Sequence, residues 1–172
     1  MGQAYPHKNL RRLIEAFAAL APQHHGLRLV LAGKPHPQQT HQLQALVAER
    51  GLGERVEFRP YVPFAALPDL YRGALALVYP SLWEGFGLPV LEAMACGTPV
   101  LTSRGSGTEE AAGPAALLID PFDQTALEAG LRRLLEEPQL RSQLRQLGLR
   151  QASRFSWTRS AAATRQLLES LL

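Results

Sequence analysis

The sequence predicts an α/β protein with a Rossmann-like, doubly wound parallel sheet flanked by helices. Short runs rich in leucine and β-branched residues alternate with longer helical patterns along the 172 residues. Hydrophobic residues make up 46% of the chain, which is enough to build a packed core. No apolar run approaches the ~20 residues that a membrane-spanning helix needs. Together these observations favour one globular domain.

The elements follow one another in strand–helix order. Right-handed βαβ units of this kind build a parallel sheet that binds ligands at the carboxyl ends of its strands. The buried runs predict strands at 27–33, 55–60, 75–81, 98–103 and 115–120. The helical patterns predict helices at 37–50, 64–73, 88–96, 106–113, 123–136, 138–152 and 156–171.

The front of the chain departs from this alternation. An amphipathic helix is predicted at 9–20, yet residues 1–7 contain no β-type run to precede it. We therefore expect the first strand to be truncated or missing. That strand is central in the order 3-2-1-4-5-6. Residues 1–5, another chain or a rearranged sheet would then have to fill its place.

Charge and cysteine content limit the classes of ligand and of covalent cross-link that this chain can have. The net charge is +3, but the arginines of the last helices alternate with glutamates, which is typical of solvated helix faces. We therefore expect no nucleic-acid partner, and the slight excess of positive charge suits an anionic small ligand. The single cysteine, Cys96, excludes an internal disulfide. No signal segment opens the chain, so we expect a cytoplasmic protein.

The segment "SLWEGFGLPVLEAMACGTPV" (81–100) places two glutamates in a glycine-containing, apolar setting. Gly85 and Gly87 allow a ligand to approach the backbone closely, and Pro89 suits the first position of a helix. The free N–H groups and partial positive charge of a helix start attract phosphate. Glu92 lies about 4.5 Å further along the helix axis, while Glu84 lies on the loop outside.

Carboxylates repel phosphate, so each glutamate should face hydroxyl groups, whose hydrogen bonds it can accept. A sugar–diphosphate–ribose ligand has this layout. The alternatives are that Glu92 only complements the helix dipole and that Glu84 is an ordinary loop charge. No Asp-x-Asp pair occurs in the sequence, so we expect no metal site.

Several segments together resemble the C-terminal, nucleotide-sugar-binding domain of the GT-B-type retaining glycosyltransferases (glycosyltransferase family 4, group 1 type). The resemblance covers nearly the whole chain. It implies that residues 1–172 form a single donor-binding domain, one half of a GT-B fold, with a terminal helix at 156–172 and without the N-terminal acceptor domain. The segments that carry it are "PHKNLRRLIEAF" (6–17), "LPDLYRGALALVYPS" (67–81), "PSLWEGFGLPVLEAMACGTPV" (80–100), "AALLIDPFD" (115–123) and "FSWTRSAAATRQLL" (155–168).

The resemblance also implies roles for individual residues. Glu84 and Lys8 would be catalytic: Glu84 would orient the donor sugar, and Lys8 would pair with the diphosphate and stabilise the departing nucleotide. Glu92 would bind the ribose, the helix start the diphosphate, and the loop 59–62 the base. The donor-binding residues would be Gln3, Arg59, Pro60, Tyr61, Val62, Gly85, Phe86, Gly87, Leu88, Pro89 and Glu92.

Two positions depart from the family pattern. Gln3 stands where many relatives carry an arginine that clamps phosphate, which leaves Lys8 as the one expected cation. Pro60 stands where the family often has glycine, and it has no N–H to offer a base. Detailed base contacts therefore do not transfer to this chain.

The implied reaction is transfer of a hexose, from UDP- or GDP-hexose, to an unidentified acceptor with retention of configuration. We expect no cofactor and no essential metal. The fragment alone should bind donor without transferring sugar, because the acceptor domain is its missing partner. The parent protein would allow peripheral membrane contact. The alternative is a folded scaffold or assembly half that binds no donor and self-associates through its incomplete sheet.

Overall fold

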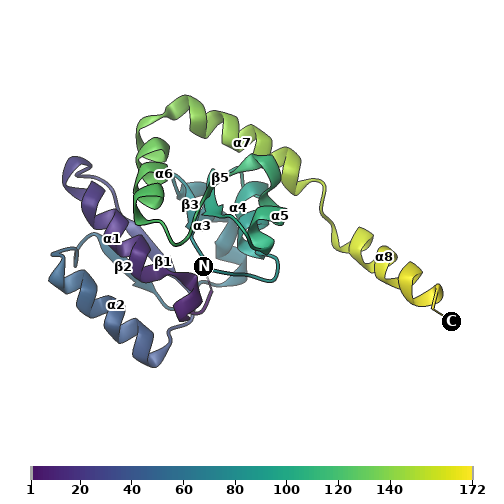
Figure 1. The fold of residues 1–172 in the computed structure, drawn as a ribbon, viewed down its shortest axis with the longest axis horizontal. Coiled ribbons are helices and arrows are strands. Elements are labelled where there is room, and N and C mark those ends of the chain that lie inside the picture. The colour runs from purple at the N-terminus through teal and green to yellow at the C-terminus, as the bar shows by residue number, and fades with distance from the viewer. Residues whose placement is uncertain (1, 172) are drawn as a thin grey trace.

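The computed structural model describes residues 2–171, which form an α/β fold (Figure 1). The strands begin and end within two residues of the predicted runs, because buried β-branched and leucine-rich segments are a strong local signal. They are β1 (Leu29–Ala32), β2 (Val56–Arg59), β3 (Leu77–Tyr79), β4 (Val100–Ser103) and β5 (Leu117–Ile119), and all pairings between them are parallel.

The helices also follow the predicted order. One difference is at 64–73, where a short 3-10 turn (Phe64–Ala66) precedes the α-helix, which begins at Leu67 with Pro68 in its first turn. The α-helices are α1 (Leu10–Leu20), α2 (Pro37–Glu49), α3 (Leu67–Gly73), α4 (Leu88–Ala95), α5 (Gly107–Ala112), α6 (Gln124–Glu136), α7 (Pro138–Ala152) and α8 (Trp157–Glu169).

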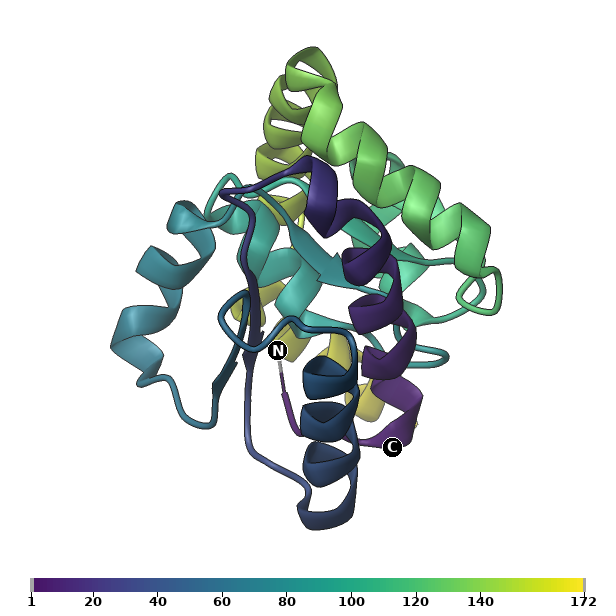
Figure 2. The ribbon, with the colours of Figure 1, turned by 90° about the vertical axis from the view of Figure 1, so that its left-hand side faces the viewer.

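Helices cover both faces of the sheet, as the α/β prediction requires. On one face α1 packs between α2 and α6, which Figure 2 shows as purple, dark blue and green helices. On the other face α3, α4 and α5 lie together, and α7 packs on α4. None of the described helices combines the length and the apolar character that crossing a membrane would require. Helix α8 projects away from the domain, and its described side chains are exposed (Figure 1).

The hydrogen-bonded sheet is divided into two parts. Strands β1 and β2 form one pair, while β3, β4 and β5 form a three-stranded sheet in that order. Strands β1 and β3 are not paired with each other, and both line one large cavity. The division falls at the central position that the sequence left without a strand, so that expectation is confirmed for the described residues.

Candidate functional site

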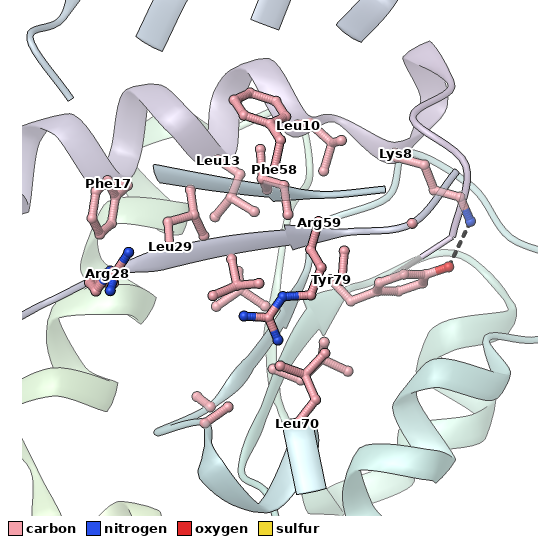
Figure 3. A pocket seen from close by; sticks show the side chains of 18 of the residues that line it. Lys8, Leu10, Leu13, Phe17, Arg28, Leu29, Phe58, Arg59, Leu70 and Tyr79 are labelled. Carbon is pink, nitrogen blue, oxygen red and sulfur yellow. Dashed lines mark hydrogen bonds between the residues drawn. The ribbon is translucent and has the colours of Figure 1, made fainter. Parts of the chain in front are cut away.

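The predicted catalytic residues meet beyond the carboxyl end of β3, although they are far apart in the chain. Lys8 ends a 3-10 turn (Pro6–Lys8), and Glu84 lies on the loop between β3 and α4. The Lys8 ammonium donates to Glu84 Oε1 and to the Tyr79 hydroxyl, each at 2.6 Å. Figure 3 shows the bond to Tyr79. Both charged side chains are only 14% exposed, so they form a partly buried ion pair.

This pair shifts the ionisation of both partners in the direction that keeps them charged. Burial lowers the pKa of Lys8, but hydrogen bonds to Glu84 and Tyr79 outweigh it and raise that pKa above its usual value. Burial likewise raises the pKa of Glu84, but the hydrogen bond and charge of Lys8 outweigh it and lower that pKa. Lys8 therefore stays cationic and Glu84 anionic near neutral pH.

The loop that carries Glu84 is tied to the segment that carries Lys8. The Leu82 N–H donates to the His7 carbonyl at 2.7 Å. The His7 and Trp83 rings stack with their centroids 4.4 Å apart. These two contacts join the residues just before Lys8 to the residues just before Glu84, so they help to fix the distance between the two backbones that carry the ion pair.

Asn9 connects further segments around the site. It is buried, and it is the one non-glycine residue among those described with a left-handed backbone, at φ 57°. Its side-chain amide donates to the carbonyls of Pro80 at 3.1 Å and Pro121 at 2.8 Å. Asn9 therefore joins the start of α1 to the loops that follow β3 and β5.

The glycines of the loop have different reasons to be glycine. A Cβ on Gly85 would meet no atom within 4 Å, so this backbone is open to a ligand. Gly87 has φ +96°, and a Cβ there would lie 2.8 Å from Thr108 Cγ2. Backbone conformation and packing thus require glycine at position 87, a reason that the sequence did not indicate. The expected approach of a ligand to Gly87 stays a prediction.

The start of α4 presents backbone donors. The sequence suggested that Pro89 occupies the first position of the helix. The helix begins at Leu88, so Pro89 occupies the second position. Gly87 provides no side-chain cap. Within residues 2–171 the N–H groups of Gly85, Phe86 and Leu88 donate no hydrogen bond. These N–H groups can donate hydrogen bonds to an anion, which the positive end of the helix dipole also attracts.

Glu92, one turn into α4, is held by a neutral partner. The Tyr71 hydroxyl donates to Glu92 Oε2 at 2.8 Å, and Tyr71 itself is buried. The Thr98 hydroxyl donates to the Tyr71 carbonyl at 2.7 Å and so fixes the end of α3. Burial and the hydrogen bond to Glu92 raise the pKa of Tyr71, which therefore remains a donor. The second oxygen of Glu92 keeps its capacity to accept.

Most of the remaining predicted residues lie along the large cavity that β1 and β3 line. Gln3, Lys8, Arg59, Pro60 and Val62 belong to its lining. The Arg59 guanidinium pairs with Glu57 at 2.6 Å. The lining identified within residues 2–171 does not include Glu84, Glu92, the segment 85–89 or Tyr61, which is 76% exposed. Lys8 therefore borders both the cavity and the glycine loop.

Three residues that position this site were not predicted from the sequence: Asn9, Tyr71 and Tyr79. Asn9 carried a usable signal, because asparagine tolerates a left-handed backbone and directly follows Lys8. Tyr71 and Tyr79 carried none, since their partners lie 21 and 71 residues away. No group of three or more His, Cys, Asp or Glu side chains in the described part of the chain is arranged to hold a metal ion.

Comparisons with known proteins agree with this fold. The model of a family described as "Glycosyl transferases group 1" matches residues 1–151. The chain is 37% identical over 165 residues to O-antigen chain mannosyltransferase B of Escherichia coli, covering 95% of this chain and 43% of that protein. A sucrose-phosphate synthase structure from Thermosynechococcus elongatus superposes with a TM-score of 0.87 at 31% identity, covering 99% of this chain and 44% of that one.

A third likeness concerns the fold alone. The Anabaena protein Alr3699/HepE, solved in complex with UDP-glucose, has a TM-score of 0.82 at 24% identity, covering 99% of this chain and 47% of that one. The α/β, GT-B-type half-fold expected from the sequence is thus confirmed. The chain spans less than half the length of the curated relatives it matches.

Proposed function

Since this chain belongs to the group 1 glycosyl transferase family, we propose that it binds the nucleoside diphosphate sugar from which its parent protein transfers a hexose with retention. The observation that carries the proposal is the order of groups along the start of α4. A carboxylate paired with a cation, then free N–H groups, then a second carboxylate follow one another. A sugar, a diphosphate and a ribose present complementary groups in the same order.

The backbone N–H groups at 85–88 would hold the diphosphate at the helix start. Glu84 would accept hydrogen bonds from the sugar hydroxyls, and the free oxygen of Glu92 from the ribose. Both carboxylates lie beside the phosphate position rather than on it. Their repulsion toward phosphate would therefore help to set the direction in which the ligand lies.

Lys8 would stabilise the departing nucleotide. An ammonium group has three donors, and two of them already bond to Glu84 and Tyr79. The third remains for a diphosphate oxygen. The raised pKa of Lys8 keeps its charge in place as negative charge develops on the leaving group. No metal is required in this scheme, because Lys8 and the helix start supply the positive charge.

The loop 59–62 would contact the base, where Arg59 and the exposed Tyr61 ring are the available groups. The printed names of two relatives, a mannosyltransferase and a protein solved with UDP-glucose, support a hexose as the sugar and UDP as one candidate carrier, and GDP remains the other candidate. Acceptor binding belongs to the rest of the parent protein. The 172-residue chain would then bind donor and transfer nothing, and measurable transfer by it alone would contradict this.

A calorimetric titration with UDP, GDP, ADP and their hexose conjugates tests the proposal. At least one nucleotide sugar should bind, and Glu92→Ala should weaken that binding by about tenfold or more, the equivalent of one charged hydrogen bond. Glu49→Ala is the matched control, because Glu49 is exposed near the end of α2, outside the candidate site. An equal loss of nucleotide-sugar affinity in Glu92→Ala and Glu49→Ala, or no binding of any of these ligands, would contradict the proposal.

The divided sheet supports a second candidate role, that of an assembly half that binds no donor. The same titration separates the two. A chain that is folded by circular dichroism yet binds none of the nucleotides fits the second role alone.

A further inference from the structure

Four aromatic rings from three separate segments form a continuous row near the carboxyl ends of β1 and β3. Trp83 belongs to the loop after β3, and His36 to the loop after β1. Tyr5 and His7 belong to the segment that leads into α1. The His7 ring stacks on Trp83 and on Tyr5, with centroids 4.4 and 5.7 Å apart. The His36 ring is tilted against Tyr5 at 5.6 Å. We call these four rings the aromatic row.

The aromatic row leaves one face of the Trp83 indole open. The planes of Trp83 and His7 differ by 25°, and those of His7 and Tyr5 by 18°, so these three rings are nearly parallel. His7 is stacked between the other two, which places Trp83 at the end of the row. Trp83 is 63% exposed. A planar ring that is stacked on one side and this exposed presents its other face to solvent.

The Trp83 indole is held in place before any ligand binds. The Leu82 N–H bonds to the His7 carbonyl, which fixes the backbone beside Trp83. The far end of the row is anchored as well, because His36 Nδ1 accepts from the Gln39 N–H at 3.4 Å and caps α2. Side chains that are ordered in advance lose little freedom on binding, so an exposed but fixed ring suits ligand recognition.

The aromatic row adjoins the candidate catalytic pair. Trp83 directly precedes Glu84, and His7 directly precedes Lys8. In the proposed function Glu84 holds the donor sugar and Lys8 the diphosphate, so the Lys8–Glu84 pair marks the position of the bond that is cleaved. A ligand on the open face of Trp83 would lie beside that bond. This is the region that the acceptor must occupy during transfer.

We propose that the open face of Trp83 stacks on a pyranose ring of the acceptor, and hence that the acceptor is a saccharide. The identity of this ring as the acceptor rests on the proposed function. One face of a pyranose ring is rich in C–H groups and packs on the electron-rich face of an aromatic ring. The hydroxyl groups around the pyranose remain free to hydrogen-bond. Tryptophan offers a large, rigid surface for such a contact.

A nucleobase is the alternative planar ligand for Trp83. In the proposed donor orientation, however, the base lies beyond the ribose, at the Glu92 end of the site. Trp83 adjoins Glu84, at the sugar end. A base on Trp83 would require the donor to lie in the opposite direction. The saccharide therefore fits better, and the base becomes an outcome of the test.

A fluorescence titration with methyl α-D-mannopyranoside and methyl α-D-glucopyranoside tests the proposal. The chain contains two tryptophans, Trp83 and Trp157, and Trp157 is 79% exposed on the projecting helix α8 (Figure 1). At least one glycoside should change the tryptophan fluorescence and reach saturation below about 50 mM. This change should persist in Trp157→Leu and vanish in Trp83→Leu, which carry the same substitution at the two positions.

Two further measurements separate stacking from other contacts. Sorbitol has the hydroxyl groups of a hexose without the ring, so it should give no saturable change. Ligand-observed NMR measures glycoside affinity without using tryptophan fluorescence. By this measure Trp83→Leu should weaken glycoside binding by about tenfold or more, and Trp83→Tyr, which keeps an aromatic face, by less than about threefold.

The position of the glycoside is tested by competition. A saturating concentration of the nucleotide sugar that binds best should leave glycoside affinity nearly unchanged, because the two ligands occupy different positions. Displacement would assign the glycoside to the donor-sugar position and overturn the proposal. Trp83→Leu should also change nucleoside diphosphate affinity by less than about threefold. A loss of tenfold or more there would assign Trp83 to the base.

Three other results would overturn the proposal. They are the absence of a saturable response to both glycosides, an equal response to sorbitol, and equal weakening by Trp83→Leu and Trp157→Leu. Failure of the proposed function has a different signature. If glycosides bind at Trp83 while no nucleotide or nucleotide sugar binds, the saccharide site stands and the donor site is contradicted. If nucleotide sugars bind and glycosides do not, the donor site stands and the saccharide site is contradicted.

Discussion

The two carboxylates at the start of α4 are held in different ways. Glu84 lies on a glycine loop and pairs with a cation, Lys8, at 2.6 Å. Glu92 lies on the helix and accepts a hydrogen bond from a neutral phenol, Tyr71, at 2.8 Å. A local chain segment supplies both glutamates, but residues far away in the sequence supply both partners.

This difference indicates that the two glutamates contribute differently to stability and to binding. At the Glu84 end the charges are compensated, so removing one leaves its partner partly buried and unpaired. At the Glu92 end the carboxylate is oriented rather than neutralised, so its removal costs the fold less. We therefore expect the Glu84 end to combine stability with binding, and the Glu92 end to serve mainly binding.

The largest effect should come from the loop that joins the two ends. Gly87→Ala forces a Cβ onto a backbone with φ +96° and places it 2.8 Å from Thr108 Cγ2. Strain and overpacking together should lower the free energy of unfolding by about 3 kcal/mol, measured by urea denaturation.

Gly85→Ala is the matched control, since its Cβ would meet nothing within 4 Å. Its stability should stay within about 0.5 kcal/mol of the wild type, while nucleotide-sugar affinity falls. Equal destabilisation by the two substitutions would contradict the different reasons given for the two glycines.

Breaking the ion pair should have the next largest effect. Glu84→Gln leaves the Lys8 ammonium with a weaker acceptor at a site where both side chains are only 14% exposed. We expect a loss of about 2–3 kcal/mol in the free energy of unfolding. In a double-mutant cycle, Lys8→Met should lower the free energy of unfolding much less in the Glu84→Gln background than in the wild type. If the two substitutions instead have additive effects, the interaction between Lys8 and Glu84 contributes nothing to stability.

The same pair predicts how stability depends on pH. The pKa of Glu84 is lowered by folding, so its contribution is present above the unfolded value, about 4.3, and is lost as pH falls through the folded value. The pKa of Lys8 is raised, so its contribution is present below about 10.4 and is lost as pH rises through the folded value. The stability difference between wild type and Glu84→Gln should be constant from about pH 5 to 10 and shrink outside that window. A difference that does not change down to pH 2.5 would contradict this.

The smallest effect on the fold should come from the Glu92 end. Tyr71→Phe removes one hydroxyl and keeps the packed ring, so we expect a loss of about 1–2 kcal/mol in stability. Nucleotide affinity should fall as well, because Glu92 loses its orienting donor. Tyr61→Phe removes an exposed hydroxyl and serves as the stability control. If Tyr71→Phe leaves affinity unchanged, Tyr71 does not position Glu92.

The sequence predicted the fold well because its signals are local. Strand runs, helical periodicity and the glycine–proline start of α4 are all encoded within a few residues, and the structure follows them closely. Even the division of the sheet could be predicted, since the helix predicted at 9–20 came too early to follow a strand.

The candidate site was only partly predictable. Glu84, Glu92 and Lys8 stood out by residue type and motif, but the bond between Lys8 and Glu84 spans 76 residues. The partners Tyr71, Tyr79 and Asn9 are selected by tertiary packing, which no local pattern records. The packing requirement at Gly87 could not be predicted for the same reason, because Thr108 comes into contact with it only in the folded chain.

The different binding roles of Glu84 and Glu92 can be tested most directly with two ligands and two variants. The nucleoside diphosphate and the nucleotide sugar that bind wild type best are titrated against Glu84→Gln and Glu92→Gln. We predict that Glu92→Gln weakens both ligands by a similar factor, about tenfold, because both contain the ribose. Glu84→Gln should weaken the nucleotide sugar by about tenfold and change the nucleoside diphosphate by less than about threefold. Equal weakening of both ligands by Glu84→Gln, or no weakening of either by Glu92→Gln, would contradict the account.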